Sequence, residues 1–503
     1  MKSVRLKFCL LTLICLLMLA SDWCTQTVSA QNPIRYSIVD ALPPDSIDVA
    51  RAQKKHFWRA TAEIVGFNAG LAIRNRIVRS ENPSFHVTWK SIWKNLKGGF
   101  KWDNDHLISN TFAHPYSGSL YYNAARSSGY NYWQSELFTM GGSLMWEYFM
   151  ESEYPSINDF VSTSIGGAAF GEVLYRTSDA LIDDTSWGVE RFGREFAALV
   201  INPLHGFNRL ITGQMWRRSA TTGRVFGTPD VAVQISLGPK AMLFQNYWNH
   251  IQGGMALRLD LEYGNRFEVK STKPYDYFTL RGEANFISSQ PMLSQLNIKG
   301  RLIAREFLED KDTHMSLGLY QHFDYYDSDT IRTVVKVPYK LGIPASLGAG
   351  LLVRDVERGA WIVDAYAHAN AVILGGILSD HFLLGNRCYN WASGFSVKAG
   401  LNAVFGRERF SFSYNYEFYR LFTWAGYRFG TDLARADEHT FSVMGDVSQS
   451  SFHINELKLD LRVTRHIYAT LIFDNYLRHT RYRDYDNVVS STSALRLMAT
   501  YKF

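Results

Sequence analysis

Residues 101–177 combine ionisable side chains with many glycines, aromatic residues and small apolar residues. An ionised group that is buried without a partner strongly destabilises a protein, so such groups form ion pairs, bind a ligand or take part in chemistry. Seven of these ionisable residues are candidates, one histidine, two arginines and four carboxylates: His114, Arg126, Arg176, Glu147, Glu151, Asp159 and Glu172.

Two kinds of chemistry fit this set. Glu147 and Glu151 are four residues apart, so they share one face of a predicted helix. Asp159 begins the next helix, where the helix dipole favours a carboxylate. One histidine with two or three carboxylates has the composition of a site for a hard or borderline divalent cation, and the same groups can serve as a general acid and base. The spacing matches no named metal signature, so the metal and any cofactor stay undefined.

A purely structural interpretation explains the same residues. Arg126 and Arg176 would neutralise Glu147 and Glu172 in a buried network that fixes the register of the helices, and His114 would brace a turn. Three interpretations therefore stay open: a structural network, a catalytic or metal site, and binding of a ligand or lipid headgroup. The candidate catalytic residues are His114, Glu147 and Asp159, and the candidate binding residues are Arg126, Glu151, Glu172 and Arg176.

Helices are predicted to position these residues. Apolar residues recur at about helical spacing over 51–80, and residues 155–159 (Pro-Ser-Ile-Asn-Asp) have the residue types of a helix start. Residues 51–210 are therefore predicted to form a helical domain. Its helices are expected over 51–80, 85–97, 118–127, 131–152, 157–182 and 187–202.

From about residue 228 the apolar period changes from near 3.6 to 2. Apolar and polar residues alternate over 257–263, 410–418 and 457–463, as in strands that face lipid on one side and a lumen on the other. We count about thirteen such segments and predict about twelve strands, because closed single-chain barrels usually have an even number. The predicted fold class is α+β multidomain, with an N-terminal helical bundle and a C-terminal antiparallel transmembrane β-barrel over 228–503.

Composition and the N-terminal residues favour an envelope protein. Of the 503 residues, 20% are charged and 15% aromatic, which fits a barrel better than a helical membrane protein, because the latter needs long uncharged runs. Residues 1–30 have the basic, apolar and small-residue regions of a signal peptide, and 31–50 are predicted to be a linker. Cys388 alone remains after signal cleavage, so we expect no intrachain disulfide.

The C-terminal strand ends in Phe503 and resembles the assembly signal of bacterial outer-membrane proteins. The expected partners are outer-membrane lipid and the barrel-assembly machinery; nucleic acid is not expected, because no charge run of that type occurs. A helical domain of this size does not fit inside a twelve-strand barrel. We therefore expect the protein in the cell outer membrane, with the helical domain facing the periplasm.

Motif residues in the central stretch follow one another in a specific order. They are Trp102-x-x-Asp105, Asn110-x-x-x-His114-Pro115-x-x-Gly118, Tyr121, Ala125-Arg126-x-x-Gly129, Ser143-x-x-Trp146-Glu147, Glu151, Pro155-Ser156-x-Asn158-Asp159 and Gly171-Glu172. In these motifs the stretch resembles a bacterial envelope family catalogued as a domain of unknown function, DUF3943. The resemblance implies the domain without naming its chemistry, and the barrel lies outside it.

Two functions follow as hypotheses. The first is an outer-membrane-anchored envelope protein whose periplasm-facing helical domain binds or organises lipid or a small solute. The second is an outer-membrane enzyme of hydrolase type, acid–base or metal-assisted, that acts on lipid, lipopolysaccharide or glycan. Passive uptake through the barrel is disfavoured, because lysines and arginines are expected beside carboxylates in the lumen.

Overall fold

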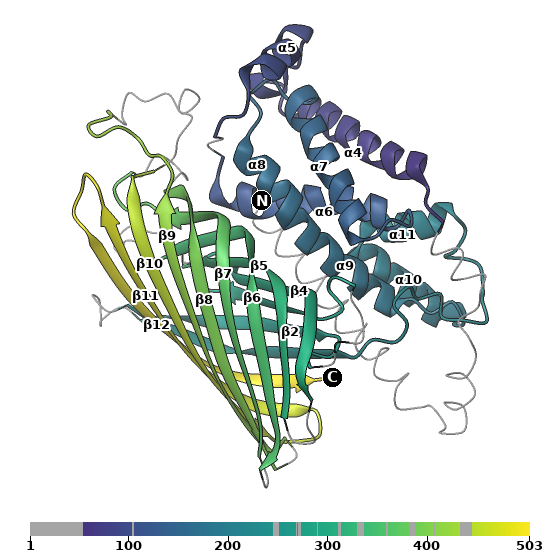
Figure 1. Ribbon diagram of the computed structural model, residues 1–503, viewed down its shortest axis with the longest axis vertical. Coiled ribbons are helices and arrows are strands. Elements are labelled where there is room, and N and C mark those ends of the chain that lie inside the picture. Colours follow the sequence, from purple (N-terminus) through teal and green to yellow (C-terminus); the bar gives the residue numbers. More distant parts are fainter. Residues whose placement is uncertain are drawn as a thin grey trace. The chain divides into compact units, whose positions relative to one another are not determined.

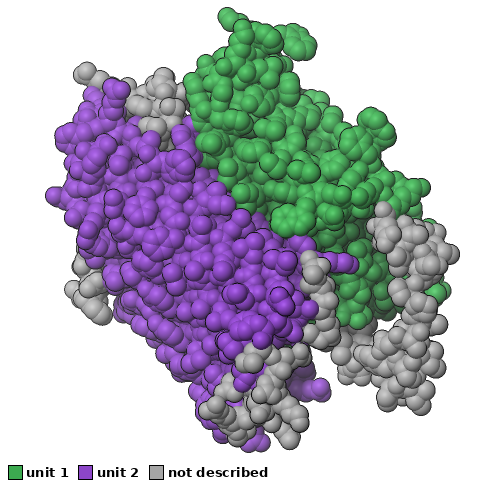
Figure 2. Space-filling model, viewed as in Figure 1, with its two compact units in different colours: residues 1–101, 113–231, 503 green, residues 102–112, 232–502 purple. Residues whose placement is uncertain are grey.

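The computed structural model describes residues 54–102, 105–244, 251–267, 269, 273–288, 290–309, 313–328, 337–358, 361–382, 388–406, 408–432 and 445–503. The predicted signal peptide and linker lie outside these residues. The described residues form two compact units, coloured separately in Figure 2. The helical unit contains the residues up to Lys101, Ala113–Val231 and the terminal Phe503, whereas Trp102–Phe112 belong with the strands Ala232–Lys502.

The helical unit follows the predicted helices closely (Figure 1). Its helices are α4 (Phe57–Val78), α5 (Trp89–Gly98), α6 (His114–Arg126), α7 (Tyr132–Phe149), α8 (Ile157–Val161), α9 (Gly167–Leu181), α10 (Gly188–Ile201) and α11 (Pro203–Ile211). The helix expected over 157–182 is divided by a π-helical turn, Ser162–Gly166. None of the described helices has both the length and the apolarity needed to cross a bilayer.

The last helix of the unit, α11, is absent from the sequence-based prediction. The sequence analysis expects the last helix to end at residue 202, but Pro203 occupies the first turn of a further helix, α11, where a backbone N–H would have no partner within the helix. The side chain of Asn202 accepts a hydrogen bond from the backbone N–H of His205 and caps the new helix.

Helix α6 contacts α4, α7, α9 and α11 and forms the centre of the helical unit. Gly118 of α6 allows a close approach, because a Cβ at this position would collide with the backbone oxygen of Thr163. Tyr121 and Tyr122 are buried on the same helix, where Tyr121 lies against Gly142 of α7 and Tyr122 against Gly171 of α9.

The strands form a closed antiparallel barrel of twelve strands among the described residues (Figure 1). They are β1 (Val231–Phe244), β2 (Ile251–Tyr263), β3 (Phe278–Phe286), β4 (Leu293–Glu309), β5 (Thr313–Asp327), β6 (Lys340–Arg358), β7 (Trp361–Leu378), β8 (Tyr389–Phe405), β9 (Phe410–Thr423), β10 (Ser448–Arg462), β11 (Ile467–Tyr482) and β12 (Val488–Lys502). Each strand pairs with the next, and β12 pairs with β1 to close the barrel. The predicted fold class and strand number are confirmed.

The barrel has charged residues inside and apolar residues outside. Arg258 and Arg496 are completely buried in the lumen, whereas Leu461 and Leu497 are exposed on the outer face. A soluble barrel has the opposite distribution, because water favours charges on the outside. An outer face of this kind is the surface that lipid covers in a membrane-embedded barrel.

Candidate functional site

The three candidate catalytic residues lie along one chain of polar contacts. His114 begins α6, and its Nε2 lies 3.4 Å from Oδ1 of Asp159 on α8. The hydroxyl of Ser156, the cap of α8, accepts a hydrogen bond from the backbone N–H of Asp159. The backbone N–H of Ser156 in turn donates to the carboxylate of Glu147 at 2.7 Å.

These contacts assign different roles to the three residues. Glu147 is buried and holds the backbone of the turn before α8. Asp159 is also buried, and it accepts a second hydrogen bond from Nδ2 of Asn158 at 2.8 Å. The side chain of His114 is 21% exposed. A carboxylate that orients a solvent-accessible imidazole is an arrangement that general acid–base catalysis uses.

The arginines form a second cluster around Glu172 of α9. Arg126 donates from Nε and Nη2 to the two carboxylate oxygens at 2.7 and 2.8 Å, and Arg176 donates from Nε at 2.8 Å. The hydroxyl of Tyr122 adds a further hydrogen bond at 2.8 Å. Burial favours the neutral carboxyl, but Arg126, Arg176 and Tyr122 outweigh it and lower the pKa of Glu172 to about 2.

The structural interpretation had assigned the arginines to Glu147 and Glu172. Both arginines bind Glu172, and Phe226 covers their guanidinium groups, the closer one at 3.8 Å. Glu172 therefore has the satisfied hydrogen bonds that a buried structural ion pair needs. Its position among two arginines and a tyrosine favours the structural interpretation for this residue.

Glu151 lies two residues after the end of α7. Its carboxylate accepts a hydrogen bond from Nε1 of Trp146 at 3.1 Å, and its backbone oxygen accepts one from Nδ2 of Asn95 on α5. Asn95 is buried and also donates to the backbone oxygen of Glu147. These contacts attach α5 to the end of α7.

A third polar cluster was missed by the sequence analysis. Arg209 of α11 donates to Asp184 and to Glu195, each at 2.6 Å, and Arg191 of α10 donates to Asp184 at 3.1 Å. Burial raises the pKa of Asp184, an effect that Arg209 opposes. Arg191 and Glu195 are four residues apart and could have been paired from the sequence, but Arg209 lies on the helix that was not predicted.

A buried serine–histidine pair also involves α11. Oγ of Ser178 and Nδ1 of His205 are 2.6 Å apart, and both residues are buried. Burial lowers the pKa of His205 to about 3, so its imidazole is neutral at physiological pH. Since neither side chain reaches the surface, the pair links α9 to α11. Across the described ranges, no group of three or more His, Cys, Asp or Glu side chains has the arrangement of a metal site.

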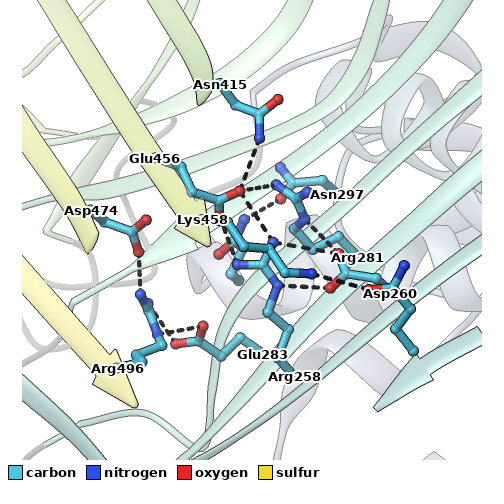
Figure 3. A network of polar contacts seen from close by, with 12 residues as sticks. Arg258, Asp260, Arg281, Glu283, Asn297, Asn415, Glu456, Lys458, Asp474 and Arg496 are labelled. Carbon is cyan, nitrogen blue, oxygen red and sulfur yellow. Dashed lines mark hydrogen bonds and ion pairs between the residues drawn. The ribbon is translucent and has the colours of Figure 1, made fainter. Parts of the chain in front are cut away.

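Inside the barrel, ion pairs cross the lumen from strand to strand (Figure 3). Arg258 of β2 binds Asp260 at 2.9 Å and Glu456 of β10 at 2.6 Å, and Arg281 of β3 binds the same two carboxylates. Arg496 of β12 binds Glu283 of β3 at 2.8 Å. Positive and negative groups alternate, so the network is an ion-paired filling of the lumen.

An apolar layer occupies another level of the lumen. It contains Tyr326, Tyr339, Tyr419, Phe452 and Tyr476, all buried. The rings of Tyr339 and Tyr476 stack with their centroids 4.5 Å apart. The ion pairs and this layer place buried side chains inside the barrel at two levels.

Residues 99–204 match the family model of DUF3943, a domain of unknown function. The match confirms the resemblance drawn from the motif residues. The DUF3943 match contains every residue of the His114 and Glu172 clusters but not Arg209. No curated protein matches the chain in sequence.

Among solved structures, the barrel is similar to porins and a hydrocarbon transporter. The NanC porin is 8% identical with a TM-score of 0.26, covering 53% of this chain and 98% of its own. The KdgM porin is 9% identical with a TM-score of 0.22, covering 53% and 99%. The toluene transporter TodX of Pseudomonas putida is 6% identical with a TM-score of 0.22, covering 54% and 89%. Likenesses this distant transfer no ligand or transport activity to the chain.

Proposed function

We propose that this protein is an outer-membrane-anchored envelope protein in which the barrel is a closed anchor and the helical unit binds lipid. The observation that carries the proposal is the exposed aromatic face of α5. Trp89 is 84% exposed and Trp93 is 60% exposed, and Leu96 is exposed on the same face of the helix. Large apolar side chains grouped on one face mark a surface that meets a partner or a membrane.

The charges of α5 favour lipid as that partner. The helix contains Lys90, Lys94 and Lys97 and no acidic residue. The amine of Lys97 lies 5.0 Å from the ring of Trp93. Tryptophans next to lysines are typical of helices that lie in the membrane interface, where the rings enter the headgroup region and the amines meet anionic lipid.

The local structure supports a preformed helix. The hydroxyl of Thr88 accepts a hydrogen bond from the backbone N–H of Ser91, and the Ser91 hydroxyl accepts one from Thr88 N–H. Asn95 anchors the opposite side of α5 to α7. The aromatic face is therefore held outward without ordering a flexible segment, which lowers the entropic cost of binding.

The filled lumen supports a barrel that anchors and does not conduct. The sequence-based expectation places the helical domain in the periplasm, and lipid binding by α5 requires only that the helix meets a lipid surface.

The experiment uses the full chain with Cys388→Ser and a single cysteine, Trp93→Cys, labelled with an environment-sensitive fluorophore. In liposomes that contain anionic phospholipid, the label is expected to shift to shorter wavelength and to be quenched by brominated lipid. The matched control is Glu81→Cys, an exposed position outside α5, whose label is expected to report water. Adding Lys90→Gln and Lys97→Gln should weaken the shift. A label at position 93 that reports water in every lipid composition contradicts the proposal.

The His114–Asp159 pair favours a second candidate, an outer-membrane hydrolase that acts on lipid, lipopolysaccharide or glycan. The observation behind it is the solvent-accessible imidazole held beside a buried carboxylate. Comparing the stability of His114 and Glu147 variants separates this candidate from a scaffold role, because functional groups often contribute little to stability.

A further inference from the structure

The outer wall of the barrel changes from exposed to buried along two strands. On β5, Leu317 is 52% exposed, whereas Phe323, on the same face, is 0% exposed. On β8, Phe395 is 44% exposed, whereas Trp391, on the same face, is 2% exposed. Residues on the same face of a strand should be similarly exposed unless another part of the chain covers some of them.

The cover comes from a short segment far earlier in the chain, defined here as Trp102 with residues 105–112 and called the docking segment. The ring of Phe112 packs edge-on against Tyr325 with centroids 4.5 Å apart. The ring of Trp102 lies 6.5 Å from that of Trp391 and 5.4 Å from that of Trp424. The docking segment therefore crosses the outer wall from β5 to the end of β9.

Two glycines of the wall allow the docking segment to approach it closely. Gly342 of β6 and Gly376 of β7 pair in register and face outward. A Cβ on Gly376 would lie 2.7 Å from Cδ1 of Leu107, and one on Gly342 would collide with the hydroxyl of Thr111. The segment approaches the wall to a distance that these two glycines permit.

The polar groups under the segment are hydrogen-bonded. Nδ2 of Asn110 donates to the hydroxyl of Tyr389 at 2.9 Å, and that hydroxyl donates to the backbone oxygen of Asp105 at 2.5 Å. Asp105 and Asn110 are motif residues of the docking segment, and Tyr389 is a residue of the barrel wall. Asn110 and Tyr389 are completely buried. Hydrogen-bond satisfaction of this kind is what a polar group needs on a wall that otherwise faces hydrocarbon.

The wall residues beneath the segment lie at one rim of the barrel. They stand near the end of β5, the start of β6, the end of β7 and the start of β8. The opposite rim holds the start of β1 and the end of β12. Because neighbouring strands are antiparallel, the docking segment lies at the rim opposite the one where the first strand starts and the last strand ends.

The lengths of the connections distinguish the two rims. The rim under the segment has three long connections, 328–339, 379–388 and 424–447, and three shorter ones, 245–250, 287–292 and 483–487. The other rim has the short connections 310–312, 359–360, 406–409 and 463–466, with 264–277 as its one long connection. In outer-membrane barrels the short turns face the periplasm and the long loops face the outside.

We propose that the docking segment takes the place of lipid on the outer wall of β5–β8, at the cell-surface end of the barrel. This gives Trp102, Asp105 and Asn110, which are motif residues of the DUF3943 match, the role of attaching that domain to the barrel. The chain leaves the helical unit at Lys101 and rejoins it at Ala113, so the proposal puts these junctions at the cell-surface end, contrary to the expectation that the helical domain faces the periplasm. The proposal does not depend on lipid binding by α5.

Docking is tested by a disulfide in the full chain with Cys388→Ser. Thr111→Cys with Gly342→Cys should cross-link in isolated outer membranes, detected as a mobility change that a reductant reverses. The matched control is Thr111→Cys with Gly253→Cys, on β2 at the same rim, which should stay reduced. Heat-modifiable migration verifies that each barrel is folded. Because Gly342→Cys adds a Cβ where the segment lies, Phe112→Cys with Tyr325→Cys, joined by a short bifunctional thiol reagent, repeats the test with both glycines in place. A folded barrel in which neither pair cross-links, or equal cross-linking in the control, overturns docking.

The side of the membrane is tested with a thiol reagent that does not cross the outer membrane. His106→Cys, on an exposed residue of the segment, should react in intact cells as Asp486→Cys does at the same rim. Thr464→Cys, in a short turn at the opposite rim, should react only after permeabilisation. Reaction of His106→Cys only after permeabilisation overturns the cell-surface assignment, whatever the disulfide shows.

Discussion

At the scale of residues, Glu172 is the clearest case of a charge that the fold keeps ionised. Arg126 and Arg176 come from two helices and bind both of its oxygens, so its burial is compensated by direct hydrogen bonds. Removing one partner from such a set leaves an uncompensated charge, which is more destabilising than losing the whole set.

We expect Glu172→Gln to lower the free energy of unfolding of the helical unit by about 3–5 kcal/mol, because two arginines lose their buried counter-ion. The measurement is thermal and urea unfolding of the detergent-folded full chain, followed by the helical circular dichroism signal. The control is Glu81→Gln, which changes an exposed carboxylate of the same unit, so its effect should stay within about 0.5 kcal/mol.

The same variant predicts a pH dependence. The folded-state pKa of Glu172 is lowered to about 2, so its stabilising contribution is complete above the ordinary carboxyl pKa of about 4.3 and is lost as the pH falls through about 2. The stability difference between wild type and Glu172→Gln should therefore shrink between about pH 5 and pH 2. A difference that stays constant over this range would contradict the pairing.

His114 and Glu147 are expected to respond differently to truncation. Glu147→Ala removes the acceptor of a buried backbone N–H and should cost about 1–3 kcal/mol. His114→Ala changes a partly exposed side chain and should stay within about 1 kcal/mol. Both are measured by thermal unfolding of the folded full chain. A large loss for His114→Ala would favour the scaffold interpretation, whereas an unchanged or raised stability would direct attention to catalysis by the His114–Asp159 pair.

At the scale of elements, apolar periodicity predicted most helices because each helix buries one face. It missed α11, since Pro203 is the residue type that also ends helices. It also missed the π-helical turn Ser162–Gly166, because the residues Ser, Thr, Ile and Gly carry no signal for a five-residue hydrogen bond pattern. The first error hid polar contacts, because α11 carries Arg209 and His205.

At the scale of the whole molecule, the barrel is filled by ion pairs and an aromatic layer. We expect no steady conductance from the wild-type chain in planar bilayers, because the side chains of the ion-pair network and of the aromatic layer would have to move before ions could pass. Tyr339→Ala with Tyr476→Ala removes a stacked pair of the aromatic layer and should make transient openings more frequent.

The matched control for this measurement is Tyr414→Ala with Tyr416→Ala, two tyrosines on the outer face of β9. These changes should leave the recordings silent. A stable, large conductance in the wild-type chain would show that the barrel is a pore and not a closed anchor.

From the sequence alone, the helical half, a barrel of about twelve strands and the alternating faces of several strands could be predicted. These properties are local, because the apolar period of a helix or a strand can be recognised within a short stretch of sequence. The DUF3943 motifs likewise identified the domain without identifying what its residues touch.

Only the tertiary structure decided which charges pair and what the motifs bind. Arg126 and Glu172 are 46 positions apart, Arg258 and Glu456 are 198 apart, and Asn110 and Tyr389 are 279 apart. The sequence does not distinguish which carboxylate pairs with which arginine. The structural interpretation therefore paired one arginine with Glu147, whereas both arginines bind Glu172. Distance and burial in the folded chain make that choice, since the strength of an ion pair depends on geometry and surroundings and not on position in the sequence.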